Sequence, residues 1–359
     1  MGLHLPFCGV PALLHRVPAP PCPSDRSRPS GAGAAAAVSP LLVPLSLSAA
    51  VSPRSRAGAR RLARRLARQR LREQSEAVAK YRRGDRSEEF DTGVSTGYRN
   101  LDQFLRPVRG EVIVVSGQPG SGKSEFLLSV AVNLAKTHGW KAGLCSFEHK
   151  NDQLLLQLLE KKLAKNVEEM SADSFQEDSE DVAWINQHFQ SVCDFSSELD
   201  LSTILSRARE LAEEGRLHNL IIDPYNYISK PWSQVPQRET ELVSSYMTQL
   251  QQFAKKYQVC VWIVVHPTKG SQQKQKDGNQ NTFDGPSLYD LQGSAHWNNK
   301  CDKGILLRRP NKDPNEGSTR PLEIHVCKVR NGESGQIGVG HLVFEPYTRS
   351  YREVVPECV

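Results

Sequence analysis

Acidic residues are almost absent from the first 72 positions of this 359-residue chain. Asp25 is the only acid there, lysine does not occur, and arginine occurs twelve times. The formal net charge of +6 therefore originates in this stretch, and it does not indicate that the rest of the chain binds nucleic acid. An N-terminus rich in Arg and Ser and poor in acids is typical of an organelle transit peptide. We expect residues 1–58 to be a disordered organelle-targeting region for mitochondria, plastids or both, with a wrongly assigned gene start as the alternative.

A clear membrane-spanning segment is also missing. The apolar stretch at 32–51 approaches the length of a transmembrane helix, but it contains two prolines and three serines, so we expect no stable membrane insertion. Residues 59–89 follow as a basic amphipathic helix or linker, in which a narrow Ala/Leu stripe lies opposite a face of arginines. The end of a transit peptide or a segment that docks on a neighbouring subunit would both explain this pattern.

Metal-binding cysteine spacing is absent as well. The eight cysteines form no C-x-x-C pair and show no His/Cys spacing of a metal site. Four of them lie in or beside apolar runs, so we expect reduced thiols in the core rather than metal ligands. These four are Cys145, Cys193, Cys260 and Cys327.

A phosphate-binding loop is the most informative segment that the chain contains. It fits G-x-x-x-x-G-K-[ST], follows the apolar run at 112–115 and precedes a helix-forming run at 125–131, which is the strand–loop–helix context that this motif requires. Backbone N–H groups and the helix N-terminus would hold a polyphosphate, Lys123 would reach its β- and γ-phosphates, and the Ser124 hydroxyl would bind Mg²⁺. The sequence therefore predicts a site for ATP and Mg²⁺. Its residues are Gly117, Gln118, Pro119, Gly120, Ser121, Gly122, Lys123 and Ser124.

Three further apolar runs end in a polar side chain, namely Glu148, Asp223 and His266. The carboxyl ends of strands are where an open α/β sheet places its ligand site. A carboxylate at Glu148 can orient and deprotonate the water that attacks the γ-phosphate, and Asp223 can hold Mg²⁺ through water. The runs at 304–307 and 322–327 are expected to be the last core strands.

The segment at 93–102, G-V-S-T-G-Y-R-N-L-D, lies just ahead of the first strand and resembles the lead of a RecA-like ATPase core. Within that superfamily the chain is most similar to ring helicases of the DnaB and Twinkle type. The tracts at 93–97, 222–226, 293–296 and 328–331 look closest to plant-type organellar Twinkle helicases. This resemblance covers residues 90–355 and implies one α/β domain. Its fold would be a RecA-like P-loop NTPase core with a mostly parallel twisted sheet flanked by helices.

The resemblance also implies roles for single residues. Glu148 would be the catalytic base, His266 the sensor of the γ-phosphate, and Arg330 of the K-x-R-N-G tract a finger inserted into the neighbouring subunit's site, assisted by nucleotide-contacting Lys328. An arginine there would offset the charge on the transferring phosphoryl group, as Lys123 does from within the loop. A subunit would not complete its own site, so a homohexameric ring is expected.

The polar segment at 269–286 and the following D-L-Q-G-S tract resemble a loop that faces the ring's central channel. A motor must grip every sequence equally, which backbone amides and a few cations achieve on phosphates. A plain surface loop is the alternative, and His296 and Trp297 would either stack on bases or pack in the core. The expected DNA-binding residues are Lys269, Gln292, Gly293, Ser294 and Lys300.

These expectations together describe an ATP-dependent helicase that moves 5′ to 3′ on single-stranded DNA and unwinds fork DNA in organellar genome replication. An organellar DNA polymerase and a single-strand-binding protein are candidate partners. Twinkle-type relatives carry a primase-like half ahead of the helicase, whereas about 90 residues precede it here, so we expect no primer synthesis, and ring assembly stays open. The alternatives are a RecA/RadA-like recombinase, a truncated accessory paralogue that does not unwind DNA, and a gene-model fragment.

Overall fold

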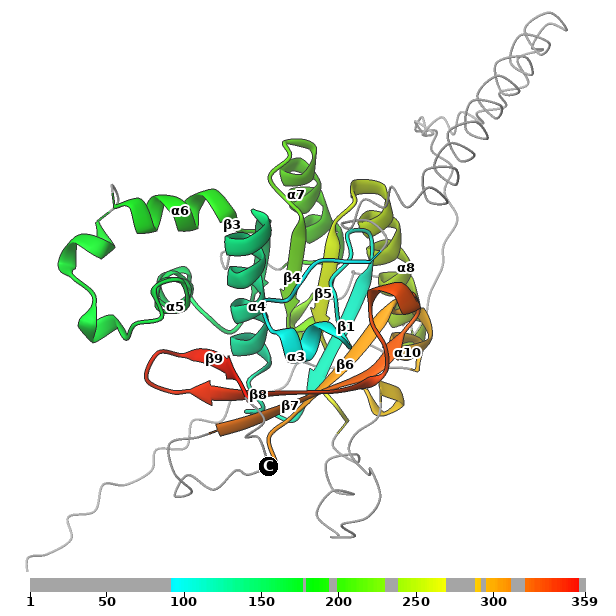
Figure 1. The fold of residues 1–359 in the computed structure, drawn as a ribbon. Helices are drawn as coiled ribbons and strands as arrows, with labels where there is room; N and C mark the ends of the chain where they lie inside the picture. The colour runs from blue at the N-terminus through cyan, green and yellow to red at the C-terminus, as the bar shows by residue number, and fades with distance from the viewer. Residues whose placement is uncertain are drawn as a thin grey trace, which may run out of the picture. The chain divides into compact units, whose positions relative to one another are not determined.

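The computed structural model describes residues 92–176, 179–193, 199–229, 238–268, 288–291, 295–310 and 320–354 (Figure 1). All of these belong to the unit Arg72–Val359. The predictions for residues 1–58 and 59–89 lie outside the described residues, as does the polar segment at 269–286. Within the described ranges, no helix combines the length and the apolar character that crossing a bilayer requires.

A nine-stranded sheet runs through the described part of the chain in the order β3-β2-β4-β5-β1-β6-β7-β8-β9. Its six strands from β3 to β6 pair in parallel, and β7, β8 and β9 continue the sheet in antiparallel fashion. The predicted mostly parallel sheet is thereby confirmed. The strands are β1 (Val112–Gly117), β2 (Ala142–Ser146), β3 (Phe189–Ser191), β4 (Asn219–Asp223), β5 (Cys260–Val264), β6 (Lys303–Arg308), β7 (Arg320–Val329), β8 (Gly338–Glu345) and β9 (Ser350–Glu353).

Helices cover both faces of this sheet (Figure 1). Because both faces are covered, the central strands β1, β4 and β5 are buried at every position and their sequences read as continuous apolar runs. The first face is covered by α3 (Arg99–Asp102), α4 (Lys123–His138), α5 (Asn151–Leu163) and α6 (Glu180–His188); the second is covered by α7 (Leu201–Glu213), α8 (Glu239–Tyr257) and α10 (His296–Lys300). Short 3₁₀ turns occur at η1 (Val167–Glu169), η2 (Ala172–Phe175), η3 (Tyr225–Tyr227), η4 (Leu288–Asp290) and η5 (Gly332–Ser334).

The strand β1 divides its side chains between the two cores. Ile113 and Val115 pack with α4 in one core, whereas Val112 and Val114 pack with α7 and α8 in the other. This alternation follows from the two-residue period of a strand. The strand therefore anchors both layers, and its position in the sheet is fixed from both sides.

The antiparallel extension differs from the sequence prediction. We expected the run at 322–327 to be the last core strand, but β8 follows and pairs with it from Val326↔Gly338 to Arg320↔Phe344, and β9 in turn pairs with β8. Their sequences alternate buried and exposed positions because one face is less completely covered than in the centre. The prediction was wrong there because it looked for continuous apolar runs.

Two of the four cysteines that we expected to be reduced are joined in the structure. Cys145 at the end of β2 and Cys193 just after β3 form a disulfide, with their Cα atoms 4.9 Å apart. The parallel pairing Leu144↔Ser191 brings these positions together although they are 48 residues apart in sequence. Cys260 and Cys327 are free thiols, and burial raises the pKa of the Cys327 thiol to about 11.

The segment before β1 is held by the carboxylate of Asp102. Its Oδ1 accepts hydrogen bonds at 2.7 Å from both the backbone N–H and the hydroxyl of Thr96, and its Oδ2 accepts one from Ser95. Thr96 is fully buried. Gly97 has φ +84°, and a Cβ there would lie 2.5 Å from the Asn133 side chain. The S-T-G…D pattern is thus explained by a turn that closes on its own aspartate.

Replacing Asp102 by alanine is expected to lower the free energy of unfolding by about 2–4 kcal/mol. The substitution removes three hydrogen bonds and leaves the buried Thr96 N–H and hydroxyl without their acceptor. Urea denaturation followed by circular dichroism measures the change. Asp102→Asn is the matched control, because an amide oxygen can still accept from Thr96, and equal losses for both variants would contradict this account.

Candidate nucleotide-binding site

The phosphate-binding loop joins β1 to α4, since β1 ends at Gly117 and α4 begins at Lys123. Gly120 and Gly122 adopt left-handed φ values of +74° and +88°. A Cβ on Gly122 would lie 2.7 Å from a guanidinium nitrogen of Arg309 and 2.8 Å from the Tyr351 hydroxyl, so no side chain fits there. These two glycines let the loop turn tightly ahead of the helix N-terminus.

Lys123 folds back over this loop. Its Nζ donates hydrogen bonds to the backbone carbonyl oxygens of Gly117 and Gln118, both at 3.1 Å. Burial lowers the pKa of this ammonium group, while the nearby carboxylates of Asp223 and Glu148 act in the opposite direction. A partly desolvated cation held inside the loop is suited to bind phosphate oxygens, because these would replace neutral carbonyl acceptors with charged ones.

The two predicted metal-linked residues lie together. The Ser124 hydroxyl is hydrogen-bonded to the Asp223 carboxylate, whose pKa is raised by burial and, to a lesser extent, by the charge of Glu148. The register Ser146↔Asp223 places the ends of β2 and β4 side by side. No group of three or more His, Cys, Asp or Glu residues is arranged for a metal within the described ranges. Ser124 and Asp223 would therefore hold Mg²⁺ together with water and phosphate oxygens.

Glu148 and His266 complete this cluster. Glu148 is exposed at the end of β2, and its charge affects the pKa values of Lys123, Asp223 and His266, which places all four in one electrostatic environment. Burial lowers the pKa of His266, and the Lys123 charge lowers it further. A neutral imidazole can accept or donate one hydrogen bond to a phosphate or water.

Among the residues predicted for the site, two buried polar atoms lack a hydrogen-bond partner within the described part of the chain. These are Oγ of Ser121, in the loop, and Nδ1 of His266. An unsatisfied buried polar atom costs free energy, and native proteins retain such atoms mainly at functional sites. A triphosphate with its water shell would supply partners for both atoms, so the residues present fit a bound nucleotide and Mg²⁺.

Sequence reasoning missed two residues at this site, Arg309 and Tyr351. The Tyr351 hydroxyl donates to the backbone oxygen of Gly122 at 3.4 Å, and the Arg309 guanidinium lies 5.5 Å from the centre of the Phe344 ring. Burial raises the pKa of Tyr351, which keeps its hydroxyl protonated. Tyr351 lies on β9 and reaches the loop because the antiparallel extension folds beside it, whereas Arg309 follows β6, whose Leu307 is in register with Gly117. Neither residue carries a motif that the sequence would reveal.

Arg330 and Lys328 lie at the opposite edge of the sheet. Gly117 of the loop is in register with Leu307, whereas Lys303, four residues earlier on β6, pairs with Val329. Four residues of extended strand span about 13 Å, so the position next to the phosphate loop and the position next to Val329 are about that far apart along β6. The structure therefore does not bring Arg330 to the phosphate loop of its own subunit, in contrast to Lys123, Ser124, Glu148, Asp223 and His266.

Of the predicted DNA-binding residues, the structure describes only Lys300. Its Nζ donates to the carbonyl oxygen and the hydroxyl of Ser244, both at 2.8 Å, and to the Thr248 hydroxyl at 2.7 Å, so its charge is held against α8. Trp297 is fully buried, with its ring edge-on to Tyr225 at 4.7 Å, which confirms the core-packing alternative. Lys269, Gln292, Gly293 and Ser294 lie outside the described residues.

Comparison with known proteins gives both curated relatives and solved structures. The chain is 38% identical over 280 residues to "Twinkle homolog protein, chloroplastic/mitochondrial" of Arabidopsis thaliana, covering 75% of this chain and 38% of that protein. It is 25% identical over 256 residues to "Replicative DNA helicase DnaC" of Bacillus subtilis, covering 69% and 54%. The solved "ATPase Domain of G40P" matches with a TM-score of 0.62 and 20% identity, covering 79% of this chain and 98% of that domain.

The chain thus spans 38% and 54% of the lengths of these two curated relatives. The solved domain shares the fold, which agrees with the sheet order and the loop geometry described above. The family model described as "DnaB-like helicase C terminal domain" matches residues 93–353, nearly the whole described part. The chain belongs to the DnaB-like helicase C-terminal domain family.

Proposed function

We propose that this chain hydrolyses ATP with Mg²⁺ and uses that reaction to move 5′ to 3′ along single-stranded DNA as a homohexameric ring, unwinding fork DNA. Family membership supports nucleotide-dependent helicase activity, the name of the Bacillus relative supports a role in replication, and the name of the Arabidopsis relative supports a setting in mitochondria or plastids. An organellar DNA polymerase and a single-strand-binding protein are the proposed fork partners. The observation that carries the ring is the separation of Arg330 from the loop of its own subunit.

The chemistry would follow from the positions of the protein's own groups. Loop amides and Lys123 would bind the β- and γ-phosphates, and Glu148 would orient the attacking water and accept its proton. Bound Mg²⁺ would offset phosphate charge between Ser124 and Asp223. His266, half-buried near Lys123, would contact the γ-phosphate through Nδ1, which has no hydrogen-bond partner among the described residues, and would respond when that phosphate leaves. Arg330 from the next subunit would stabilise the charge on the transferring phosphoryl group.

DNA contact would come from the segment between β5 and α10. Lys269, Gln292, Gly293 and Ser294 are proposed to contact phosphates in the channel. Lys300 is proposed to support DNA binding indirectly. Its hydrogen bonds to Ser244 and Thr248 fix α10, the helix directly after this segment, to α8. Lys328 is proposed to assist at the neighbouring nucleotide.

Glu148→Gln is expected to reduce DNA-stimulated ATP hydrolysis by about 10²–10⁴-fold while leaving nucleotide binding intact, because an amide cannot accept the proton of the attacking water. Phosphate release by the full chain, with and without single-stranded DNA, measures the rate, and a fluorescent ATP analogue measures binding. Glu214→Gln, which changes an exposed carboxylate at the C-terminal end of α7, is the control. Full activity of Glu148→Gln would refute its assignment as the base.

Mixing two impaired variants tests whether Arg330 acts on the neighbouring subunit. Arg330→Ala and Glu148→Gln alone are each expected to retain only a small residual rate of ATP hydrolysis. In mixed rings some interfaces combine an intact Glu148 from one subunit with an intact Arg330 from the next, so activity should return. Mass photometry reports the oligomer, and phosphate release reports the rate. Mixed hexamers without recovered activity would count against action in trans, and open filaments on DNA would favour a recombinase.

A further inference from the structure

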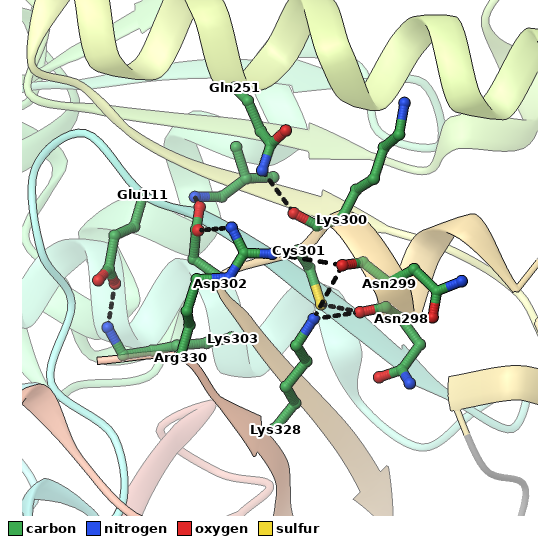
Figure 2. A network of polar contacts seen from close by, with 11 residues as sticks. Glu111, Gln251, Asn298, Asn299, Lys300, Cys301, Asp302, Lys303, Lys328 and Arg330 are labelled. Atoms are coloured by element: carbon green, nitrogen blue, oxygen red, sulfur yellow. Dashed lines mark hydrogen bonds and ion pairs between the residues drawn. The ribbon is translucent and has the colours of Figure 1, made fainter. Parts of the chain in front are cut away.

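The guanidinium group of Arg330 is held by two acceptors (Figure 2). Its Nη1 donates to Oδ1 of Asp302 at 3.0 Å, and its Nη2 donates to the backbone oxygen of Asn299 at 3.3 Å. The backbone is fixed at the same point, since Arg330 N–H donates to the Asp302 carbonyl oxygen at 2.9 Å. The Arg330 side chain remains 47% exposed, so the group is fixed on one side and open on the other.

Asp302 is itself immobilised. Its side chain is 7% exposed, and its Oδ2 accepts a hydrogen bond from the Val112 N–H at 2.9 Å, at the first residue of β1. The Asp302 N–H returns a bond of the same length to the Val112 carbonyl oxygen. Each carboxylate oxygen thus has one partner, a backbone amide on one side and Arg330 on the other, and the aspartate cannot move without breaking the start of β1.

The second acceptor comes from the end of α10. Lys328 donates to the carbonyl oxygens of Asn298 and Asn299, and Arg330 shares the latter. Lys328 and Arg330 lie two residues apart, which directs both side chains to one face of the chain. The strand pairing shifts register between Gly304 and Ile305, and such an irregularity turns the following side chains. The end of α10 is fixed in turn, because Gln251 of α8 donates to the Lys300 carbonyl oxygen at 2.6 Å.

We propose that Asp302 is a positioning residue for the reaction, which sets the orientation of Arg330 before a neighbouring subunit arrives. This inference rests on the proposed function, in which Arg330 acts on the next subunit's nucleotide. A guanidinium carries five N–H donors, and among the described residues Asp302 and Asn299 use two of them, one on Nη1 and one on Nη2. Three donors are left for a phosphate, so Arg330 can act without leaving its anchors.

Orientation matters here because the side chain is long and half-exposed. A free arginine samples many rotamers, and ordering one costs on the order of 1–2 kcal/mol at the moment of catalysis. Because the buried Asp302 already holds the guanidinium in the folded protein, the side chain is ordered during folding rather than at the moment of catalysis. Small displacements of a catalytic group lower rates by up to about 10²-fold, so loss of the anchor should affect the catalytic step more than substrate binding.

Asp302→Asn is the test variant, in the full chain and in rings with single-stranded DNA. An asparagine has a single oxygen acceptor, so it cannot serve both Val112 N–H and Arg330. We expect kcat for ATP hydrolysis to fall about 10- to 100-fold with KM for ATP and the hexamer unchanged. In an Arg330→Ala background the same substitution should have no further effect, because the residue it positions is gone.

Glu111→Gln is the matched control. Glu111 is a carboxylate at the same edge of the sheet, paired with the buried Lys303, and it makes no hydrogen bond to Arg330 among the described contacts. If Asp302→Asn disturbs cooperative unfolding, Asp302→Ser replaces it, since a hydroxyl can still accept from Val112. Equal losses of kcat in Asp302→Asn and Glu111→Gln, or a further loss in the Arg330→Ala background, would overturn the inference.

Different experimental results would overturn the proposed function and the positioning role of Asp302. Wild-type rings that hydrolyse no ATP would remove the proposed function and this inference with it. A wild type that is active, an Arg330→Ala variant that is strongly impaired and an Asp302→Asn variant as fast as the wild type would leave the proposed function standing and overturn the positioning role alone.

Discussion

The hydrogen-bonded position of β1 between β5 and β6 is the constraint on which the rest of the domain depends. Its register with β6 places Gly117 beside Leu307 at one edge and Ile113 beside Lys303 at the other. The Ser116 hydroxyl also donates to the Val265 carbonyl oxygen at 2.6 Å, which fixes the end of β5 just before His266. A one-residue slip would exchange the faces of every side chain in the strand, and both cores oppose it.

The nucleotide site carries an energetic cost in the nucleotide-free domain. Lys123 and Asp223 are both buried. Burial lowers the pKa of Lys123 and raises that of Asp223, which in each case favours the neutral form. Ser121 and His266 add buried atoms without partners among the described residues. The apolar cores on both sides of the sheet must offset these terms. A bound nucleotide would give these buried groups partners and lower the cost of burying them, and this gain would add to the affinity for a polyphosphate.

Features that depend on residues adjacent in the sequence could be predicted from it, whereas features that depend on which strands pair could not. The phosphate loop, the strand-end residues Glu148 and Asp223, and the helix at 239–257 each follow from a local pattern. The disulfide between Cys145 and Cys193 depends on the pairing of β2 with β3, and the contacts of Tyr351 with the loop depend on β9. Strand order arises from long-range burial, which a single sequence leaves open.

The anchoring of Arg330 connects the two edges of the sheet. Asp302 is bonded to Val112, the first residue of β1, and Gly117 at the other end of that strand begins the phosphate loop. In the proposed ring each subunit would face two nucleotides, one through its loop and one through Arg330. A single buried strand, hydrogen-bonded on both sides, joins these two groups rigidly. Because a packed core shifts as a unit rather than bending, a change at one interface would reach the other as a displacement of the whole strand.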